Sequence, residues 1–69
     1  MTGIDIIVNG ESRAVAAGTT VAALLQALQL AGGRIAVERN REIVPRSRFE
    51  TERLNGGDRL EIVHFVGGG

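Results

Sequence analysis

The side chains of this 69-residue chain offer little chemistry of their own. There is no cysteine, which excludes thiolate nucleophiles, disulfides and cysteine-bound zinc. All eight basic residues are arginine, so no lysine amine is available for a Schiff base. His64 is the one histidine, and no residues at suitable spacing complete a metal site or a catalytic triad around it. We therefore interpret His64 as an ordinary strand residue.

The remaining candidate for chemistry is the carboxylate of Gly69, which follows Gly67 and Gly68 after an apolar run ending at Val66. Composition alone favours a frayed end or a leftover linker. A terminal carboxylate is nevertheless ionised at neutral pH, because its pKa is about 3.5. Three extended residues span about 10 Å, and glycine has no Cβ to obstruct a narrow channel. The tail is therefore either debris or an arm that delivers a carboxyl group.

Length, charge and hydropathy limit the remaining classes. A chain of 69 residues makes one domain at most and buries only about 60% of its unfolded surface. Eight basic residues balance eight acidic ones, and no basic stripe with interleaved aromatic residues indicates nucleic-acid binding. No apolar run of membrane-spanning length and no signal peptide stand out. We expect a cytoplasmic protein that binds neither nucleic acid nor membrane.

The N-terminal segment predicts a β-hairpin. Apolar residues at positions 4, 6 and 8 alternate along a first strand, Asn9-Gly10 is a strong turn signal, and residues 12–16 form the second strand. A two-residue loop would place Ile6 opposite Arg13. A three-residue loop, 9–11, would place Ile6 opposite Ala14 and leave Arg13 on the other face. We favour the longer loop, because register follows the buried face.

One amphipathic helix is predicted next. Apolar residues lie at i, i+3, i+4 and i+7, namely Val21, Leu24, Leu25 and Leu28, which is the helical spacing. Thr19 or Thr20 is expected to cap the first turn, and the Gly32-Gly33 pair to supply a left-handed stop. This predicts a helix of about ten residues with one apolar stripe against a sheet.

The rest of the chain reads as three strands. A strand, a turn near 38–41 and a short strand precede Pro45, which is typical of a sheet edge or strand end. Residues 46–54 are irregular with room for a helical turn, and 55–58 form a turn. In the last strand positions 60, 62, 64 and 66 share one face, and 61, 63 and 65 the other. We expect this strand beside the first, the two ending in opposite directions, with the C-terminus at the rim.

The order β-β-α-β-β-β predicts an α+β fold, a mixed sheet of four to five strands with one helix across it. Four stretches carry a more specific signal: TV-x-x-LL at 20–25, EIVPRS at 42–47, the Gly57-Asp58 turn, and LEIVHFVGGG at 60–69. Over the whole chain this pattern resembles the ThiS family, the bacterial sulfur carriers of thiamine biosynthesis, which are ubiquitin-like β-grasp proteins. Gly67, a third glycine before the final pair, is one departure. The resemblance implies a β-grasp domain, 1–66, and a flexible tail, 67–69.

The resemblance implies a carrier and not an enzyme. A partner adenylyltransferase resembling ubiquitin-activating enzymes would use ATP-Mg to adenylate the Gly69 carboxylate. Sulfur from a cysteine desulfurase or a rhodanese-like protein would then replace AMP and give a thiocarboxylate, and a thiazole synthase would take up that sulfur. The chain itself would bind no cofactor and no metal, and would be a monomer when free.

Partner docking must come from the folded part. We expect Val63, Phe65 and Val66 to contribute, since they flank the tail and exposed apolar surface near a functional end suits a partner. Burial of Phe65 in the core is the equally weighted alternative. Four arginines, at 46, 48, 53 and 59, either add polar rim contacts or form a solvated face. Two other functions stay open: the small subunit of molybdopterin synthase, a related sulfur carrier, and a non-catalytic β-grasp adaptor.

Overall fold

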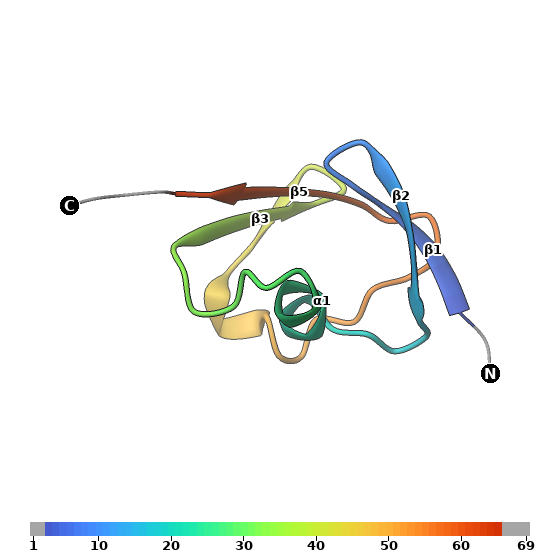
Figure 1. Cartoon of the computed structure of the whole chain (residues 1–69), viewed down its shortest axis with the longest axis horizontal. Coiled ribbons are helices and arrows are strands. Elements are labelled where there is room, and N and C mark those ends of the chain that lie inside the picture. Colours follow the sequence, from blue (N-terminus) through green and yellow to red (C-terminus); the bar gives the residue numbers. More distant parts are fainter. Residues whose placement is uncertain (1–2, 66–69) are drawn as a thin grey trace.

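A computed structural model describes residues 3–65, which form a single five-stranded sheet with one α-helix. The elements are β1 (Gly3–Val8), β2 (Glu11–Ala16), α1 (Val21–Ala27), β3 (Ile35–Arg39), β4 (Glu42–Val44), the 3₁₀ turn η1 (Arg46–Arg48) and β5 (Arg59–His64). The strand order is β2-β1-β5-β3-β4. Figure 1 shows α1 lying across one face of this sheet. The predicted α+β, β-grasp arrangement is confirmed.

The last strand lies at the centre of the sheet. It pairs antiparallel with β3 over five residue pairs, from Ile35↔His64 to Arg39↔Leu60. It pairs with β1 only at Ile7↔Arg59 and Val8↔Leu60. This second pairing is parallel, so the expectation that the first and last strands end in opposite directions is wrong. The crossover through the helix places β3 antiparallel to β1, and β5, which is antiparallel to β3, therefore runs in the direction of β1.

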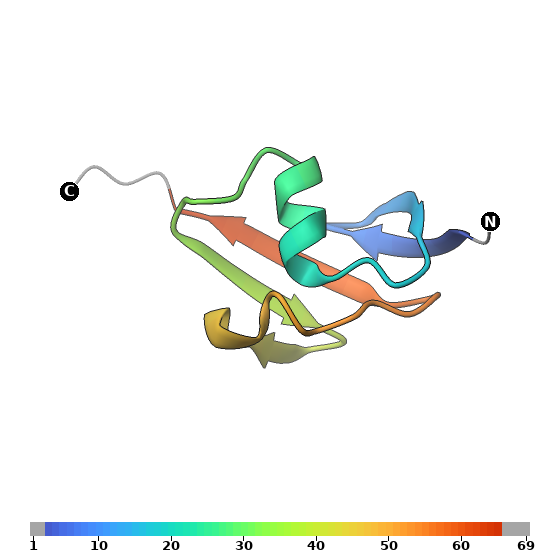
Figure 2. The same ribbon diagram turned by 90° about the horizontal axis from the view of Figure 1, so that it is seen from below.

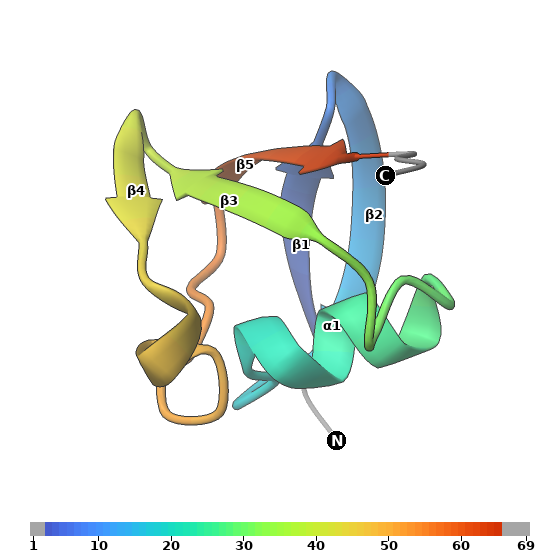
Figure 3. The same cartoon turned by 90° about the vertical axis from the view of Figure 1, so that its left-hand side faces the viewer.

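The core lies between the sheet and α1, and Figure 3 shows these two layers edge on. Ile6, Leu24 and Leu60 are the largest of the fully buried side chains. They come from β1, α1 and β5, so three elements far apart in the sequence depend on one contact region. Val21 and Leu25 of the predicted helical stripe are also buried, and Leu28 packs against the same cluster. The predicted core-facing stripe is confirmed.

The hairpin uses the two-residue loop, so the favoured three-residue loop is wrong. Val8 lies opposite Glu11 and Ile6 opposite Arg13. Asn9 and Gly10 have φ of 49° and 85°, as the twist-matched type I′ turn requires. Burial does not decide the register here, because β2 is an edge strand in which only Val15 is half-buried and packs against the core. Turn geometry therefore sets the register.

The helix is shorter than predicted and is stopped by another residue. The hydroxyl of Thr20 caps it by accepting the N–H of Ala23 at 3.1 Å, as expected. The helix ends after seven residues, and Gln29, with φ of 62°, is the left-handed residue. The N–H groups of Gln29 and Leu30 donate to the carbonyls of Gln26 and Leu25, at 3.0 and 2.8 Å. This is a Schellman motif, and it turns Leu30 back onto the core.

The side chain of Asn9 extends the short contact between β1 and β5. Its Oδ1 accepts the N–H of Ile62 at 2.8 Å, and its Nδ2 donates to the carbonyl of Ile62 at 3.1 Å. The N–H of Asn9 donates to the carbonyl of Leu60 at 2.9 Å. An amide side chain presents one donor and one acceptor, as a backbone peptide does. Asn9 thus stands in for a further ladder residue beside β5.

We predict that Asn9→Gly lowers the free energy of unfolding by about 1–2 kcal/mol, because both hydrogen bonds to Ile62 are lost while the positive φ is kept. The matched control is Gln29→Gly, at an exposed residue that also has a positive φ. This control is expected to be neutral or stabilising by up to about 1 kcal/mol. Urea denaturation measures both variants, and equal destabilisation by the two would contradict the role given to Asn9.

Candidate functional site

The end of β5 presents apolar side chains to solvent. Val63 and Phe65 are 52% and 55% exposed, so the alternative in which Phe65 fills the core is wrong. The half-buried Phe49 packs against the core instead. The N–H of Phe65 donates to the carbonyl of Arg34 at 2.9 Å, which continues the ladder with β3 past His64. Val66, Gly67, Gly68 and Gly69 lie outside the described residues.

Alternation along β5 explains this exposure. Leu60 and Ile62 point to the helix side and are buried, whereas Glu61 and Val63 point to the opposite face and are exposed. Figure 3 shows no element covering that opposite face within the described residues. Val63 lies across from Ala36 of β3. The predicted division of the strand into two faces is confirmed for the buried positions 60 and 62.

His64 is exposed and lies next to the loop that enters β3. A Cβ built on Gly33 would come within 2.9 Å of His64 Nε2, so a glycine leaves room for the imidazole here. Arg46 also reaches this loop, since its Nη2 donates to the carbonyl of Gly33 at 3.0 Å. Among residues 3–65 no group of His, Asp and Glu side chains is arranged to hold a metal ion.

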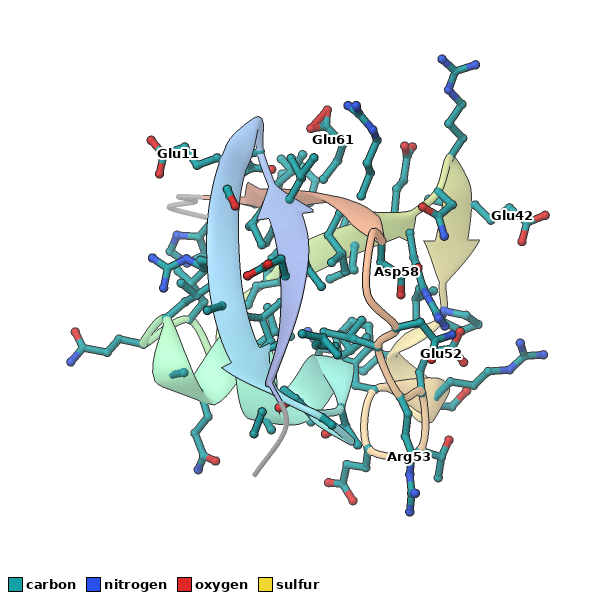
Figure 4. All side chains as sticks on the ribbon, turned by 90° about the vertical axis from the view of Figure 1, so that its right-hand side faces the viewer. Glu11, Glu42, Glu52, Arg53, Asp58 and Glu61 are labelled. Atoms are coloured by element: carbon teal, nitrogen blue, oxygen red, sulfur yellow. The ribbon has the colours of Figure 1, made fainter. Side chains whose placement is uncertain are left out.

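A network around Asp58 holds the start of β5. The Asp58 carboxylate accepts hydrogen bonds from Arg39 Nε at 2.8 Å, Asn40 Nδ2 at 3.0 Å and the Asn55 N–H at 2.8 Å. Arg39 also pairs with Glu52 at 2.9 Å, and Figure 4 labels Asp58 and Glu52 near each other on the right of the view. The turn before β5 is thereby tied to the β3–β4 turn. Residue types alone indicate only a turn at 55–58, because the partners that give Asp58 this role come from residues far away in the sequence.

These contacts determine the ionisation of Asp58. Burial by itself would raise the pKa of this carboxyl, but the hydrogen bonds from Asn55 and Asn40 and the charge and hydrogen bond of Arg39 outweigh it. The pKa of Asp58 is lowered from its ordinary 3.8 as a result. A carboxyl with a lowered folded-state pKa stabilises the fold above the unfolded pKa. That stability is lost as the pH falls through the folded-state pKa.

The four arginines considered for rim contacts, Arg46, Arg48, Arg53 and Arg59, are all exposed. Arg39, which sequence reasoning did not single out, is the arginine that forms ion pairs within the described part of the chain. A rim role for the four others stays a prediction. No helix among residues 3–65 is long and apolar enough to cross a membrane.

Comparison with known proteins places this geometry in a family. Residues 6–69 match the ThiS family, a range that covers all but the first five residues and includes the glycine tail. The chain belongs to the ThiS family. The crystal structure of a ThiS thiamine biosynthesis protein from Geobacter metallireducens superposes with a TM-score of 0.80 at 35% identity, over 96% of this chain and 100% of that one. The fold is therefore the ubiquitin-like β-grasp.

Curated relatives of ThiS type occur both alone and within larger proteins. The sulfur carrier protein ThiS of Bacillus subtilis is 46% identical over 50 residues, which are 72% of this chain and 76% of the relative. A thiazole synthase of Paramagnetospirillum magneticum is 50% identical over 66 residues, 96% of this chain but 20% of the relative. A second thiazole synthase, of Magnetococcus marinus, is 44% identical over the same shares. The chain thus spans about a fifth of these thiazole synthases.

We predict that Asp58→Asn lowers the free energy of unfolding by about 1–3 kcal/mol at neutral pH, because the hydrogen-bonded carboxylate is replaced by an amide that presents donors to donors. The difference from wild type shrinks at acid pH, where the carboxyl of the wild type becomes protonated. Urea denaturation at about pH 7 and about pH 3 measures this change. Glu42→Gln is the control, an exposed carboxylate expected to change stability by less than about 0.5 kcal/mol. A destabilisation that is the same at both pH values would contradict the role of the Asp58 charge.

Proposed function

We propose that this ThiS-family chain is a sulfur carrier in thiamine biosynthesis and that the carboxylate of Gly69 is the group that carries sulfur. The observation that supports this most strongly is the family match, which extends through the glycine tail to residue 69. The exposed apolar pair Val63 and Phe65 just before the tail supports a docking role for the end of β5. The chain contains no cysteine, so under this proposal sulfur cannot be held as a persulfide.

The chemistry proceeds in three steps that start from the carboxylate. A carboxylate resists nucleophilic attack because it is already negatively charged. A partner adenylyltransferase joins the Gly69 carboxylate to the α-phosphate of ATP-Mg and releases pyrophosphate. The outer sulfur of a persulfide on a cysteine desulfurase or rhodanese-like protein then attacks the acyl carbon, so that a C–S bond forms and the bond to AMP breaks. A thiol reductant supplies two electrons to cleave the S–S bond of the resulting acyl disulfide, which leaves the thiocarboxylate on Gly69 and returns the donor cysteine as a thiol.

The thiocarboxylate donates its sulfur to thiazole synthase. Support comes from relatives in which a region like this chain forms about a fifth of a protein named thiazole synthase. A shared polypeptide brings donor and acceptor together at high effective concentration. This chain acts in such a pathway as a co-substrate, and the bond-making groups belong to its partners. The adaptor alternative is an outcome of the loading test below, and transfer of sulfur to thiazole synthase separates this proposal from the molybdopterin synthase alternative.

Loading of the tail is directly measurable. We predict that incubation with the adenylyltransferase of the same cell, ATP-Mg and a sulfur donor raises the intact mass of the chain by the difference between sulfur and oxygen. Deletion of Gly69, or Gly68→Ala, slows loading by about tenfold or more, since a Cβ obstructs the passage of an extended tail. Gly56→Ala is the matched control, because a Cβ there meets only Ile4, at 3.8 Å. An unmodified chain with every cognate adenylyltransferase would instead favour the adaptor.

Docking through the end of β5 predicts a position-dependent loss of affinity. Val63→Ser and Phe65→Ser are each expected to weaken binding to thiazole synthase, the enzyme that receives the sulfur, by about tenfold. This is the effect of removing an apolar anchor. Ile43→Ser is the control, since Ile43 is 65% exposed but lies on β4 at the edge of the sheet. Calorimetric titration measures all three variants. Equal loss at Ile43 and Val63 would show that the contact is not centred on the end of β5.

A further inference from the structure

The hydrogen-bonding groups of β5 alternate between its two neighbours. The N–H of Phe65 donates to the carbonyl of Arg34 at 2.9 Å, and the N–H of Asn40 donates to the carbonyl of Arg59 at 2.7 Å. Odd-numbered residues of β5 therefore bond to β3. In a strand, successive residues direct their N–H and C=O groups to opposite sides. The groups of Leu60, Ile62 and His64 consequently point away from β3, toward the β1 side.

On the β1 side, the main-chain groups of β5 have hydrogen-bond partners only near the beginning of the strand. The carbonyl of Leu60 accepts the N–H of Asn9 at 2.9 Å, and both main-chain groups of Ile62 bond to the Asn9 side chain. The main-chain N–H and C=O of His64 come next. Because β1 pairs with β5 only as far as Leu60, no strand among residues 3–65 lies beside His64 on this side to bond them. Figure 2 shows why, because β5 runs on past the end of β1 toward the C-terminal side while β3 stays alongside it. β5 is the central strand in the order of the sheet, but its last residues have a neighbouring strand on one side only.

We propose that this open edge, the main-chain N–H and C=O of His64, pairs with an extended segment of the enzyme that receives the sulfur. An added strand would continue, beside His64, the hydrogen-bonding that β1 and Asn9 begin along β5. This proposal rests on the proposed function and identifies how its partner is held. At Ile62 this edge already bonds groups from outside the strand, because the Asn9 side chain both donates to the Ile62 carbonyl and accepts the Ile62 N–H. Main-chain pairing of this kind gives affinity, and neighbouring side-chain contacts give specificity.

The expected occupant is a segment of thiazole synthase. Relatives that combine a ThiS-like region with a thiazole synthase in one protein indicate that the two parts work side by side. The added strand lies next to the face that carries Val63 and Phe65, each more than half exposed. The segment should therefore present its main chain to His64 and apolar side chains to that face.

Proline scanning separates this edge from ordinary side-chain contacts. Proline lacks the N–H, and within sheets it is tolerated where that N–H faces outward. His64→Pro removes the open donor and leaves the bond from Phe65 to Arg34 in place. His64→Ala removes the same side chain but keeps the donor. Ala14→Pro is the matched control on another edge. In the two-residue hairpin Val8 and Glu11 face each other, so odd residues of β2 bond to β1 and the N–H of Ala14 points outward.

We expect His64→Pro to weaken binding to thiazole synthase by about tenfold or more relative to His64→Ala, and Ala14→Pro to bind within about twofold of wild type. Amide hydrogen exchange of the wild-type chain keeps the proposal testable if a proline variant fails to fold. The His64 amide should exchange at least about tenfold more slowly in the complex than in the free chain.

Three results would overturn the proposal. The first is equal affinity of His64→Pro and His64→Ala, and the second is a His64 amide that exchanges as fast in the complex as in the free chain. The third is protection of this amide by the adenylyltransferase alone, or by raising the concentration of the chain itself, which would assign the edge to a different occupant. Sulfur loading of the wild-type chain is measured in parallel. Loading without His64 protection removes only this inference, whereas absence of loading removes the proposed function.

Discussion

Pairing of β5 on both sides at its start and on one side at its end determines how the rest of the molecule is arranged. At the start, Leu60 is 1% exposed and lies between β1 and β3. The helix packs beneath this point, and the Asp58 network holds the preceding turn. Toward the end, β5 leaves β1 behind and keeps only β3. The same strand is therefore a central strand at its start and an edge strand at its end.

A domain of this size has little stability to spare, since a small chain buries a modest fraction of its surface. Hydrogen bonds and ion pairs between polar side chains consequently stabilise the parts of the fold that the apolar core does not reach. Asn9 completes a ladder that β1 is too short to complete, and Arg39 joins two turns through Asp58 and Glu52. Both devices lie close to β5.

The sequence was sufficient to predict the features that repeat along the chain with a regular period. Alternation at positions 4, 6 and 8 and the helical stripe of Val21, Leu24 and Leu25 reflect burial, which recurs with a fixed period. The features that were predicted incorrectly, the end of the helix and the register of the hairpin, depend on single residues. Gln29 ended the helix before the glycines because a Schellman motif returned Leu30 to the core. The hairpin register followed the φ angles of Asn9 and Gly10, since its outer strand has too little burial to decide.

In the candidate site, too, some features could be predicted from the sequence and others could not. The glycine tail and its apolar neighbours Val63 and Phe65 were apparent from residue types alone, and the exposure of that pair is a property of the fold. The open edge at His64 was not apparent, because the direction of a main-chain group follows from strand register and not from residue type. Asp58 looked like a turn residue, and its partners Arg39 and Asn40 come from a turn nearly twenty positions earlier.

The central claim is that this chain carries one sulfur atom on Gly69 and gives it up to thiazole synthase. Transfer in a single turnover tests it most directly. The chain is first loaded with radiolabelled sulfur, purified, and mixed with thiazole synthase and its other substrates without ATP. The account predicts that label passes into the thiazole product, one sulfur per chain, while the mass of the chain returns to that of the carboxylate. Formation of unlabelled thiazole while the chain keeps its sulfur would contradict it.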